Sequence, residues 1–317
     1  MSKTEDLDAY GSPVNDPNSK IGTNTPSSPE GGEAYASGSQ FKLILQTFFE
    51  NKLAIVGVGL VVIAAIFCFI GPLFYHTNQV ATTYNITAAP GGHHPLGTDQ
   101  NGYDVLGRLM IGGQSSLEIG FSVAIIATFI GVLWGAIAGF VGGIVDTIMM
   151  RIVDTLLSIP TLLLLIFLAS VFKPTLKLLI IVISAVSWLS PARLVRGEAL
   201  TLRVRDYVKA VRVMGGGSRR IVVRHIIPNA IGTIVVNATF QIADAILIMA
   251  TLSYLGLGLP PPAANWGSML SDGVNYVYDG YWWLIYPAGF AIILTVVAFN
   301  LIGDAIRDSL EVRLQKR

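Results

Sequence analysis

The stretch RGEALTLRVRDYVKAVRVMGGGSRRIVVRHIIP, Arg196 to Pro228, lies between long apolar segments and decides how the rest of the chain is interpreted. It is rich in arginine, and a cationic loop between two membrane spans is expected to face the cytoplasm. Val208, Val211 and Met214 recur at helical spacing, which predicts a short amphipathic helix outside the bilayer.

A run of glycines divides this stretch into two helices. Gly215, Gly216 and Gly217 allow a sharp turn after the first helix, because glycine adopts backbone angles that other residues avoid. Ser218 is the predicted N-cap of a second helix, which we expect to end at Pro228. Two helices joined by a glycine turn predict a rigid protrusion.

The composition excludes several classes of protein. With 317 residues, 52% hydrophobic and only 13% charged, the chain is more apolar than an ordinary soluble domain. Its single cysteine, Cys68, lies in an apolar run, so a disulfide framework and a cysteine metal site are excluded. The phosphate-binding pattern GxxxxGK[ST] is missing, so any ATP chemistry is expected in another chain.

Hydropathy divides the chain into four parts. Residues 1–38 are polar and predict a disordered cytoplasmic tail, and residues 39–52 predict an interfacial helix. Residues 53–306 predict a membrane domain of six helices, and residues 307–317 a cytoplasmic tail. The six predicted spans are Leu53–Phe74, Gly120–Gly143, Leu156–Phe172, Leu178–Ser190, about Ala230–Leu257 and about Trp283–Ile302.

Glycines at positions 131, 135, 139 and 143 repeat every four residues in the second predicted span. Such a stripe predicts the close approach of another helix.

The distribution of positive charge predicts the orientation. Six spans place both termini on one side, and the cationic stretch places that side in the cytoplasm. The predicted outward segments carry few basic residues, namely Arg108, Lys173 and Lys177.

The central stretch resembles the cytoplasmic signature of ABC importer permeases, which reads EAA, three residues, Gly, nine residues, then Ile-x-Leu-Pro. The matching positions are Lys209, Ala210, Val211, Gly215, His225, Ile227 and Pro228. Lys209, Val211 and His225 depart from the usual residues, so the register depends on the others.

Other segments are similar to the dipeptide, oligopeptide and nickel branch of these permeases. The matching segments are His94–Asp99 with Asp104, Val105, Leu106 and Arg108; Asp146, Met150, Arg151, Asp154 and Pro160; and Leu255–Pro261 with Trp266, Gly267, Asp272 and Gly273. Together with the central stretch they cover the chain from about residue 41 onward.

This resemblance implies an all-α polytopic fold of the type I importer class, and a peptide importer in the bacterial cytoplasmic membrane. It implies a second permease, two ATPase subunits that bind ATP and magnesium, and an extracytoplasmic binding protein as partners, with no cofactor, catalytic residue or nucleic acid in this chain. The coupling loop, residues 196–228, would contact the ATPase subunit. The residues it assigns to that contact are Asp206, Tyr207, Lys209, Ala210, Met214, Gly215, Gly216, Arg219 and Pro228.

Three polar residues mark the fifth predicted span. Asn237, Gln241 and Asp244 are four and three residues apart, so they share one helical face. A carboxylate within a span normally faces a cavity or a partner. The face is therefore either part of a hydrated translocation path, which we favour, or a helix contact with the partner permease that the resemblance implies.

Other function classes account for less of the sequence. A nickel or other small-solute importer shares the architecture, whereas a secondary transporter would leave the cationic loop without a purpose. A metal site at His76, His93 and His94 lacks acidic or cysteine partners at ligand spacing. A serine nucleophile at Ser115 or Ser116 lacks the surrounding motif.

Overall fold

The structure is a computed structural model that describes residues 46–79 and 85–315, with side chains up to residue 310. The described residues all belong to one compact unit. The predicted tail, residues 1–38, lies outside the described residues, as does the first part of the predicted interfacial helix. The rest of that helix is described, and residues 46–50 are helical.

Every regular element of the described residues is a helix, as the sequence predicts. The α-helices are α2 (Lys52–Ala65), α3 (Gly71–Phe74), α4 (Val105–Val141), α5 (Gly143–Leu157), α6 (Thr161–Val171), α7 (Leu176–Ser187), α8 (Leu189–Leu202), α9 (Asp206–Val213), α10 (Ser218–Ile221), α11 (Ile227–Tyr254), α12 (Trp266–Val274) and α13 (Tyr286–Gln315). Two π-helical turns, η1 (Ile66–Ile70) and η2 (Val222–Ile226), and two 3-10 turns, η3 (Val277–Asp279) and η4 (Trp282–Leu284), complete the set.

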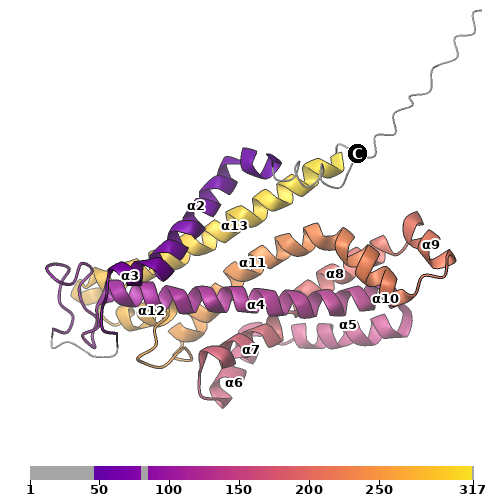
Figure 1. Cartoon of the computed structure of the whole chain (residues 1–317). Coiled ribbons are helices and arrows are strands. Elements are labelled where there is room, and N and C mark those ends of the chain that lie inside the picture. Colours follow the sequence, from indigo (N-terminus) through magenta and orange to yellow (C-terminus); the bar gives the residue numbers. More distant parts are fainter. Residues whose placement is uncertain (1–45, 80–84, 316–317) are drawn as a thin grey trace, which may run out of the picture. The chain divides into compact units, whose positions relative to one another are not determined.

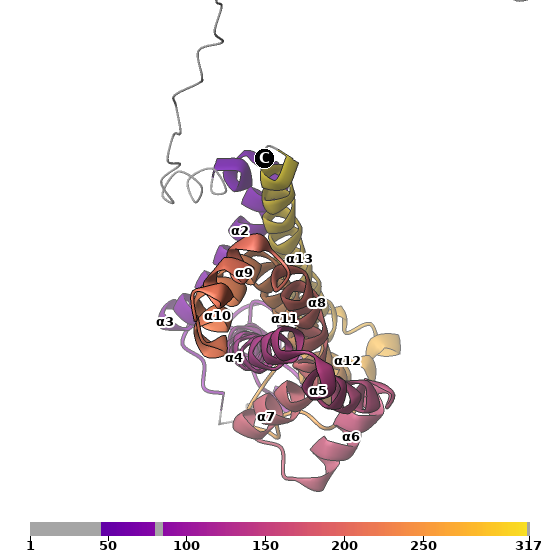
Figure 2. The same ribbon diagram turned by 90° about the vertical axis from the view of Figure 1, so that its right-hand side faces the viewer.

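Helix α4 lies at the centre of the bundle, in contact with α5, α7, α8 and α11 (Figures 1 and 2). Helix α11 in turn contacts α13, and α13 contacts α2. In Figure 1 the loop 85–104, α3 and α12 lie at one end, called here the α12 end, and α9 and α10 lie at the opposite α9 end.

Among the described residues, five helical segments are long and apolar enough to cross a membrane, and a bent pair makes a sixth if it counts as one span. The five are Lys52–Phe74, Val105–Val141, Leu176–Leu202, Ser218–Tyr254 and Trp282–Leu310. The bent pair is α5 with α6.

The prediction that the third span is a single helix, Leu156–Phe172, was wrong. Helix α6 has 11 residues, about 16 Å of rise, against about 30 Å of hydrocarbon. It meets α5 at an angle of 82°. Pro160 causes the break, because proline disfavours helical angles at the residue before it.

The second span begins earlier than predicted, at Val105 instead of Gly120. Its glycine stripe packs as expected at three positions. A Cβ at Gly131, Gly135 or Gly139 would collide with the backbone of α8. The fourth glycine, Gly143, instead begins α5 with a φ of +57° and has open space around it.

Pro228 does not end the second helix of the cationic stretch, so that prediction was wrong. Helices α10 and α11 form one continuous segment through the π-turn η2. Because proline has no N–H and its ring collides with the carbonyl four residues back, the chain needs a local adjustment. The Ile227 N–H donates to Val222 O, five residues back, and the helix then continues.

The same device occurs near the start of the chain. The Gly71 N–H donates to Ile66 O, again five residues back and directly before a proline, Pro72. Both π-turns therefore let a helix pass a proline, which π-bulges allow at the cost of one extra residue.

Three apolar clusters hold the helices together. One contains Leu165, Leu179 and Met249 between α4, α6, α7 and α11. A second contains Cys68 and Trp266 at the α12 end. The third joins α9 and α10 to the adjacent ends of α4 and α8.

Candidate functional site

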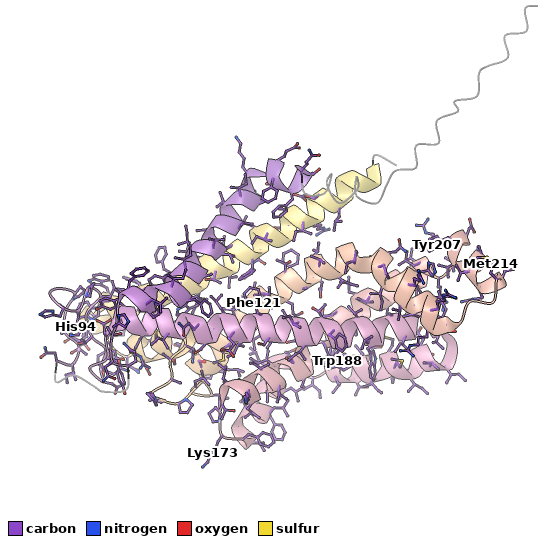
Figure 3. All side chains as sticks on the ribbon, in the orientation of Figure 1. His94, Phe121, Lys173, Trp188, Tyr207 and Met214 are labelled. Carbon is purple, nitrogen blue, oxygen red and sulfur yellow. The ribbon has the colours of Figure 1, made fainter. Side chains whose placement is uncertain are left out.

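The protrusion that the cationic stretch predicts is present at the α9 end. Val208 of α9 is fully buried in the third apolar cluster, whereas Val213 and Met214 are 88% and 77% exposed. Tyr207 and Met214 lie at the tip of this end in Figure 3. The protrusion is therefore anchored on one side and presents apolar side chains on the other.

The glycine turn closes α9 with a Schellman motif. Gly215 has a φ of +82°, its N–H donates to Arg212 O, and the Gly216 N–H donates to Val211 O. This pattern satisfies the last carbonyls of a helix and favours glycine at the left-handed position. Gly216 is also required, because a Cβ there would collide with Val211.

Ser218 is the first residue of α10 and not its N-cap. The N-cap is Gly217, and no side chain caps this helix end. The sequence pattern misplaced the cap by one residue, because a serine followed by helical residues fits either position.

The nine predicted ATPase-contact residues are exposed except for Gly216, which is half-buried. Eight of them lie in α9, the glycine turn and α10. Pro228 lies apart from these, one residue into α11. Their role in binding an ATPase subunit stays a prediction.

Two ion pairs tie α5 to α8 beside the protrusion. Arg196 donates to both carboxylate oxygens of Asp146, at 2.5 and 2.7 Å, and Arg193 donates to Asp154 at 2.6 Å. The two hydrogen bonds between the Arg196 guanidinium and the Asp146 carboxylate fix the orientation of both side chains, in addition to the attraction between their charges. Both acids belong to the segments that resemble the permease family, but their partners lie too far away in the sequence to be predicted from it.

The three polar residues of the fifth span line one cavity of about 340 Å³. Asn237, Gln241 and Asp244 occupy the α11 wall, as their spacing predicts. The opposite wall comes from the α5–α6 corner and the α7–α8 junction. Residues from that wall are Leu157, Thr161, Val186, Ser187 and Ser190.

The cavity side chains have few partners within the chain. The Asn237 Oδ1 atom is buried without a hydrogen bond. Gln241 is only 7% exposed, and Asp244 is exposed to the cavity side. The three side chains therefore line open space within this chain, and their place in a translocation path stays a prediction.

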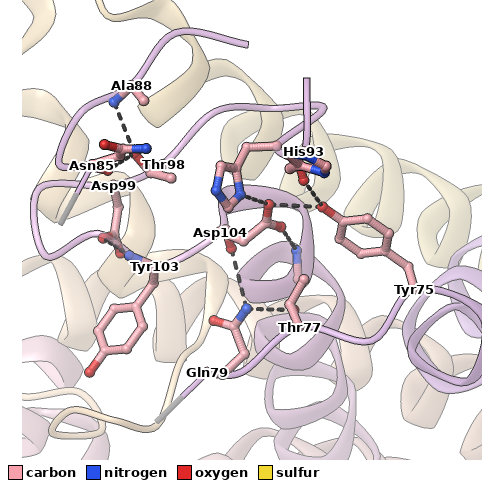
Figure 4. Close-up of polar contacts among 12 residues, drawn as sticks. Tyr75, Thr77, Gln79, Asn85, Ala88, His93, Thr98, Asp99, Tyr103 and Asp104 are labelled. Carbon is pink, nitrogen blue, oxygen red and sulfur yellow. Dashed lines mark hydrogen bonds and ion pairs between the residues drawn. The ribbon is translucent and has the colours of Figure 1, made fainter. Parts of the chain in front are cut away.

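The α12 end holds a polar network around Asp104 (Figure 4). This carboxylate caps α4 by accepting from the Gly107 N–H at 2.7 Å. It also lies 2.8 Å from His94 Nδ1 and accepts from the Tyr75 hydroxyl at 2.9 Å. Burial, together with the hydrogen bond and charge of Asp104, raises the pKa of Tyr75 to about 12. His94 thus has a carboxylate partner, and the loop motif is a structural element.

A second buried pair lies beside this network. The Arg108 Nε atom is 3.4 Å from Asp99 Oδ2, with side chains 6% and 12% exposed. Burial raises the pKa of Asp99, although Arg108 and two backbone N–H groups oppose the shift. Burial also raises the pKa of Asp272, with opposing contributions from Gln100 and Arg108. The positive charge of Arg108 therefore lowers the pKa of both Asp99 and Asp272, against the effect of burial.

The same end is closed by Trp266, which is 2% exposed. Its indole N–H donates to Leu109 O at 2.9 Å, and a Cβ at the neighbouring Gly267 would collide with Ala250. The tryptophan and glycine that resemble the permease motif therefore lock α12 against α4 and α11.

Comparison with known proteins identifies the relatives of this chain. Residues 131–316 match the family described as the binding-protein-dependent transport system inner membrane component. Residues 39–90 match the N-terminal TM domain of oligopeptide transport permease C.

Two characterised relatives are similar over most of their length. The oligopeptide transport system permease protein OppC of Bacillus subtilis is 40% identical over 279 residues, which cover 88% of this chain and 91% of the relative. The dipeptide transport system permease protein DppC of the same organism is 37% identical over 270 residues, 84% of each chain. A solved structure of the MetNI methionine ABC transporter in inward facing conformations has a similar fold, with a TM-score of 0.52 and 22% identity, over 64% of this chain and 96% of that chain.

Proposed function

Because this chain belongs to the family of binding-protein-dependent transport system inner membrane components, we propose that it is the permease subunit of an ATP-driven importer of di- and oligopeptides. The relatives' names, oligopeptide and dipeptide transport permeases, support the substrate class. The chain carries no catalytic residue in this proposal, and ATP with magnesium is bound by separate ATPase subunits.

The observation that carries the proposal is the continuous helix from the protrusion to the cavity. Helix α10, η2 and α11 run without a break from Ser218 to Tyr254. Their first turn lies beside α9, and their later turns carry Asn237, Gln241 and Asp244 in the cavity wall. A movement imposed on the protrusion would therefore be transmitted along one rigid element.

The protrusion supplies the surface for an ATPase partner. Val208 anchors α9 to the bundle, and the exposed Val213 and Met214 offer apolar area for contact. Apolar side chains exposed in this way often mark a protein interface. Closure of an ATPase dimer would move this surface, and the change requires that docking differ in free energy between the two states.

The assembly we propose contains a second, related permease, two ATPase subunits and an extracytoplasmic binding protein, in the bacterial cytoplasmic membrane. Both termini and the protrusion face the cytoplasm. The arginines around α9 and α10 support this orientation, since basic loops stay on the cytoplasmic side.

A nickel importer is the alternative substrate class, and the cavity favours peptides. Imidazole is a side-chain ligand that suits nickel, and no histidine is among the described residues that line the cavity. The side chains around the cavity supply amides, hydroxyls and a single carboxylate, which suit the polar groups of a peptide.

The test is uptake by the assembled complex in proteoliposomes, with the binding protein in the outer solution and ATP enclosed in the lumen on the α9 side. We expect labelled trialanine to enter only when ATP is enclosed. Uptake driven by an ion gradient without ATPase subunits would instead identify a secondary transporter, and ATP-dependent uptake of nickel but no peptide would reassign the substrate.

A further inference from the structure

The cavity beside α11 has one charge. Asp244 is the sole ionisable residue among the described side chains that line it. In the part of the chain that the structure describes, the Asp244 side chain has neither an ion pair nor a hydrogen bond. The two arginines of α8 are paired elsewhere, with Asp146 and Asp154. The carboxylate therefore faces the cavity without a counter-charge.

Two neutral acceptors lie on the same helical face as Asp244. The Asn237 Oδ1 atom is buried and unpaired. Gln241 is more than nine-tenths buried, and its side-chain amide makes no hydrogen bond with any described residue. Since buried polar groups are almost always paired, these side chains indicate that a donor enters the cavity.

The missing ligand must supply both positive charge and several donors. An ammonium group has three N–H donors and no acceptor, and a hydrogen bond between ionised partners is stronger than one between neutral groups. A bare divalent cation fits less well, because it requires several carboxylate or carbonyl oxygens and the lining side chains include one carboxylate.

We propose that this cavity binds a protonated primary amine of the substrate, with Asp244 as its counter-charge and the amide oxygens of Asn237 and Gln241 as acceptors. The inference rests on the proposed function, because in a peptide importer the amine is the N-terminal ammonium or a lysine side chain. Asp244 is then a specificity-determining residue that orients the peptide during passage.

The first test measures whether the cavity prefers cations to anions, and it does not depend on transport. Cys68 is the chain's single cysteine, so a Cys68→Ala, Ser190→Cys chain, assembled with cysteine-free partners in nanodiscs, carries one reporter thiol at the cavity wall. The measurement is the rate of its reaction with a cationic ethylammonium and an anionic ethylsulfonate methanethiosulfonate.

A cleft of one sign of charge raises the local concentration of counter-ions at least about tenfold. We therefore expect the cationic reagent to be favoured by about tenfold relative to a free thiol, and the preference to disappear after Asp244→Asn. Equal preference with and without the carboxylate, or no reaction with either reagent, would overturn the proposal. The first of these results is also expected if a basic side chain of the second permease occupies the site.

The second test identifies the source of the amine. Uptake of Ala-Ala-Ala and Ala-Lys-Ala is measured for the wild type, Asp244→Glu and Asp244→Asn in the assembled importer. If the N-terminal ammonium binds, Asp244→Asn lowers uptake of both peptides by a similar factor of about ten, and Asp244→Glu recovers most of it. If the lysine side chain binds, the loss is confined to Ala-Lys-Ala. No loss for either peptide would contradict the proposal.

Glu118→Gln is the matched control, because Glu118 is an exposed carboxylate of a membrane span that does not line the cavity. Uptake should be unchanged in this variant, and an equal loss would show that any carboxylate in a span has the same effect. Absence of peptide uptake by the wild type would refute the proposed function, whereas the thiol assay would still decide whether the cavity attracts cations.

Discussion

Charged side chains crowd both the α12 end and the α9 end, but their surroundings differ. Arg108 and Asp99 are 6% and 12% exposed and paired with each other. Lys209 and Asp206 in α9 also form a pair, at 3.2 Å, but are 63% and 100% exposed. The charges of a buried pair must be balanced within the chain. An exposed pair is solvated by water and contributes little to the stability of the fold. The difference shows that charge at the α12 end is paired inside the chain, whereas charge at the α9 end is open to solvent, as the proposed docking surface requires.

The strongest test of this comparison is Gly215→Asp at the α9 end. The side chain would require a left-handed backbone, at a cost of about 1 kcal/mol, and would add a negative charge to the proposed docking surface. We expect normal membrane insertion but loss of the ATP hydrolysis that loaded binding protein stimulates. Insertion is measured by fractionation and hydrolysis by phosphate release. Normal stimulation in this variant would contradict the role of the protrusion.

Arg108→Met should have the largest effect on stability. It leaves Asp99 buried without its cation, which costs about 3–5 kcal/mol for a buried pair, and removes the charge attraction on the nearby Asp272. The variant should lose thermal stability, as measured by tryptophan fluorescence in detergent. Arg212→Met is the matched control, because the exposed Arg212 lies over the Phe140 ring at 5.4 Å, an interaction of about 0.5–1 kcal/mol.

The pH dependence of Arg108→Met follows from the direction of the shifts. Burial already raises the pKa of Asp99 and Asp272, and loss of the arginine raises both further. A carboxyl with a raised pKa in the folded state binds more protons there, so stability falls as pH rises through the window between the two values. The destabilisation should therefore be smaller at about pH 5, closer to the ordinary range of a carboxyl pKa, than at about pH 8. An equal deficit at both would contradict the buried charge as its cause.

Asp104→Ala should have an intermediate effect. The carboxylate caps α4 and joins His94 and Tyr75, and loss of an N-cap costs about 0.5–2 kcal/mol. Asp104→Asn keeps the cap, so it should recover a large part of the loss in thermal stability. If both variants were equally destabilised, the ion pair with His94 would matter more than the cap.

Ser218→Ala should have the smallest effect, because this serine does not cap α10. Surface changes away from caps and buried groups usually stay within about 0.5 kcal/mol. Thermal stability and stimulated hydrolysis are therefore expected to match the wild type. A loss as large as that of Asp104→Ala would show that the serine caps the helix in the assembled complex.

Much of the fold could be predicted from local patterns. Apolar runs locate the spans, and the spacing of Val208, Val211 and Met214 predicts α9. The shared face of Asn237, Gln241 and Asp244 follows from helical periodicity alone. These predictions hold because helix formation and side-chain direction depend on residues within a few positions of each other.

Other features required the tertiary structure. The pairing of Asp146 with Arg196 joins residues 50 positions apart, and the contribution of Ser187 and Ser190 to the cavity depends on where α7 and α8 meet α11. Likewise, proline in a sequence predicts a helix end, yet the π-turn before Pro228 lets the helix continue.

The sequence by itself determined that this chain is helical, crosses a membrane and carries a cationic protrusion, because composition and periodicity are local properties. The tertiary structure alone decided that α5 and α6 bend by 82°, that the glycine stripe packs on α8 and that an unpaired carboxylate faces a cavity. These depend on which segments come together in space, since close packing and charge pairing join residues that are distant in the chain.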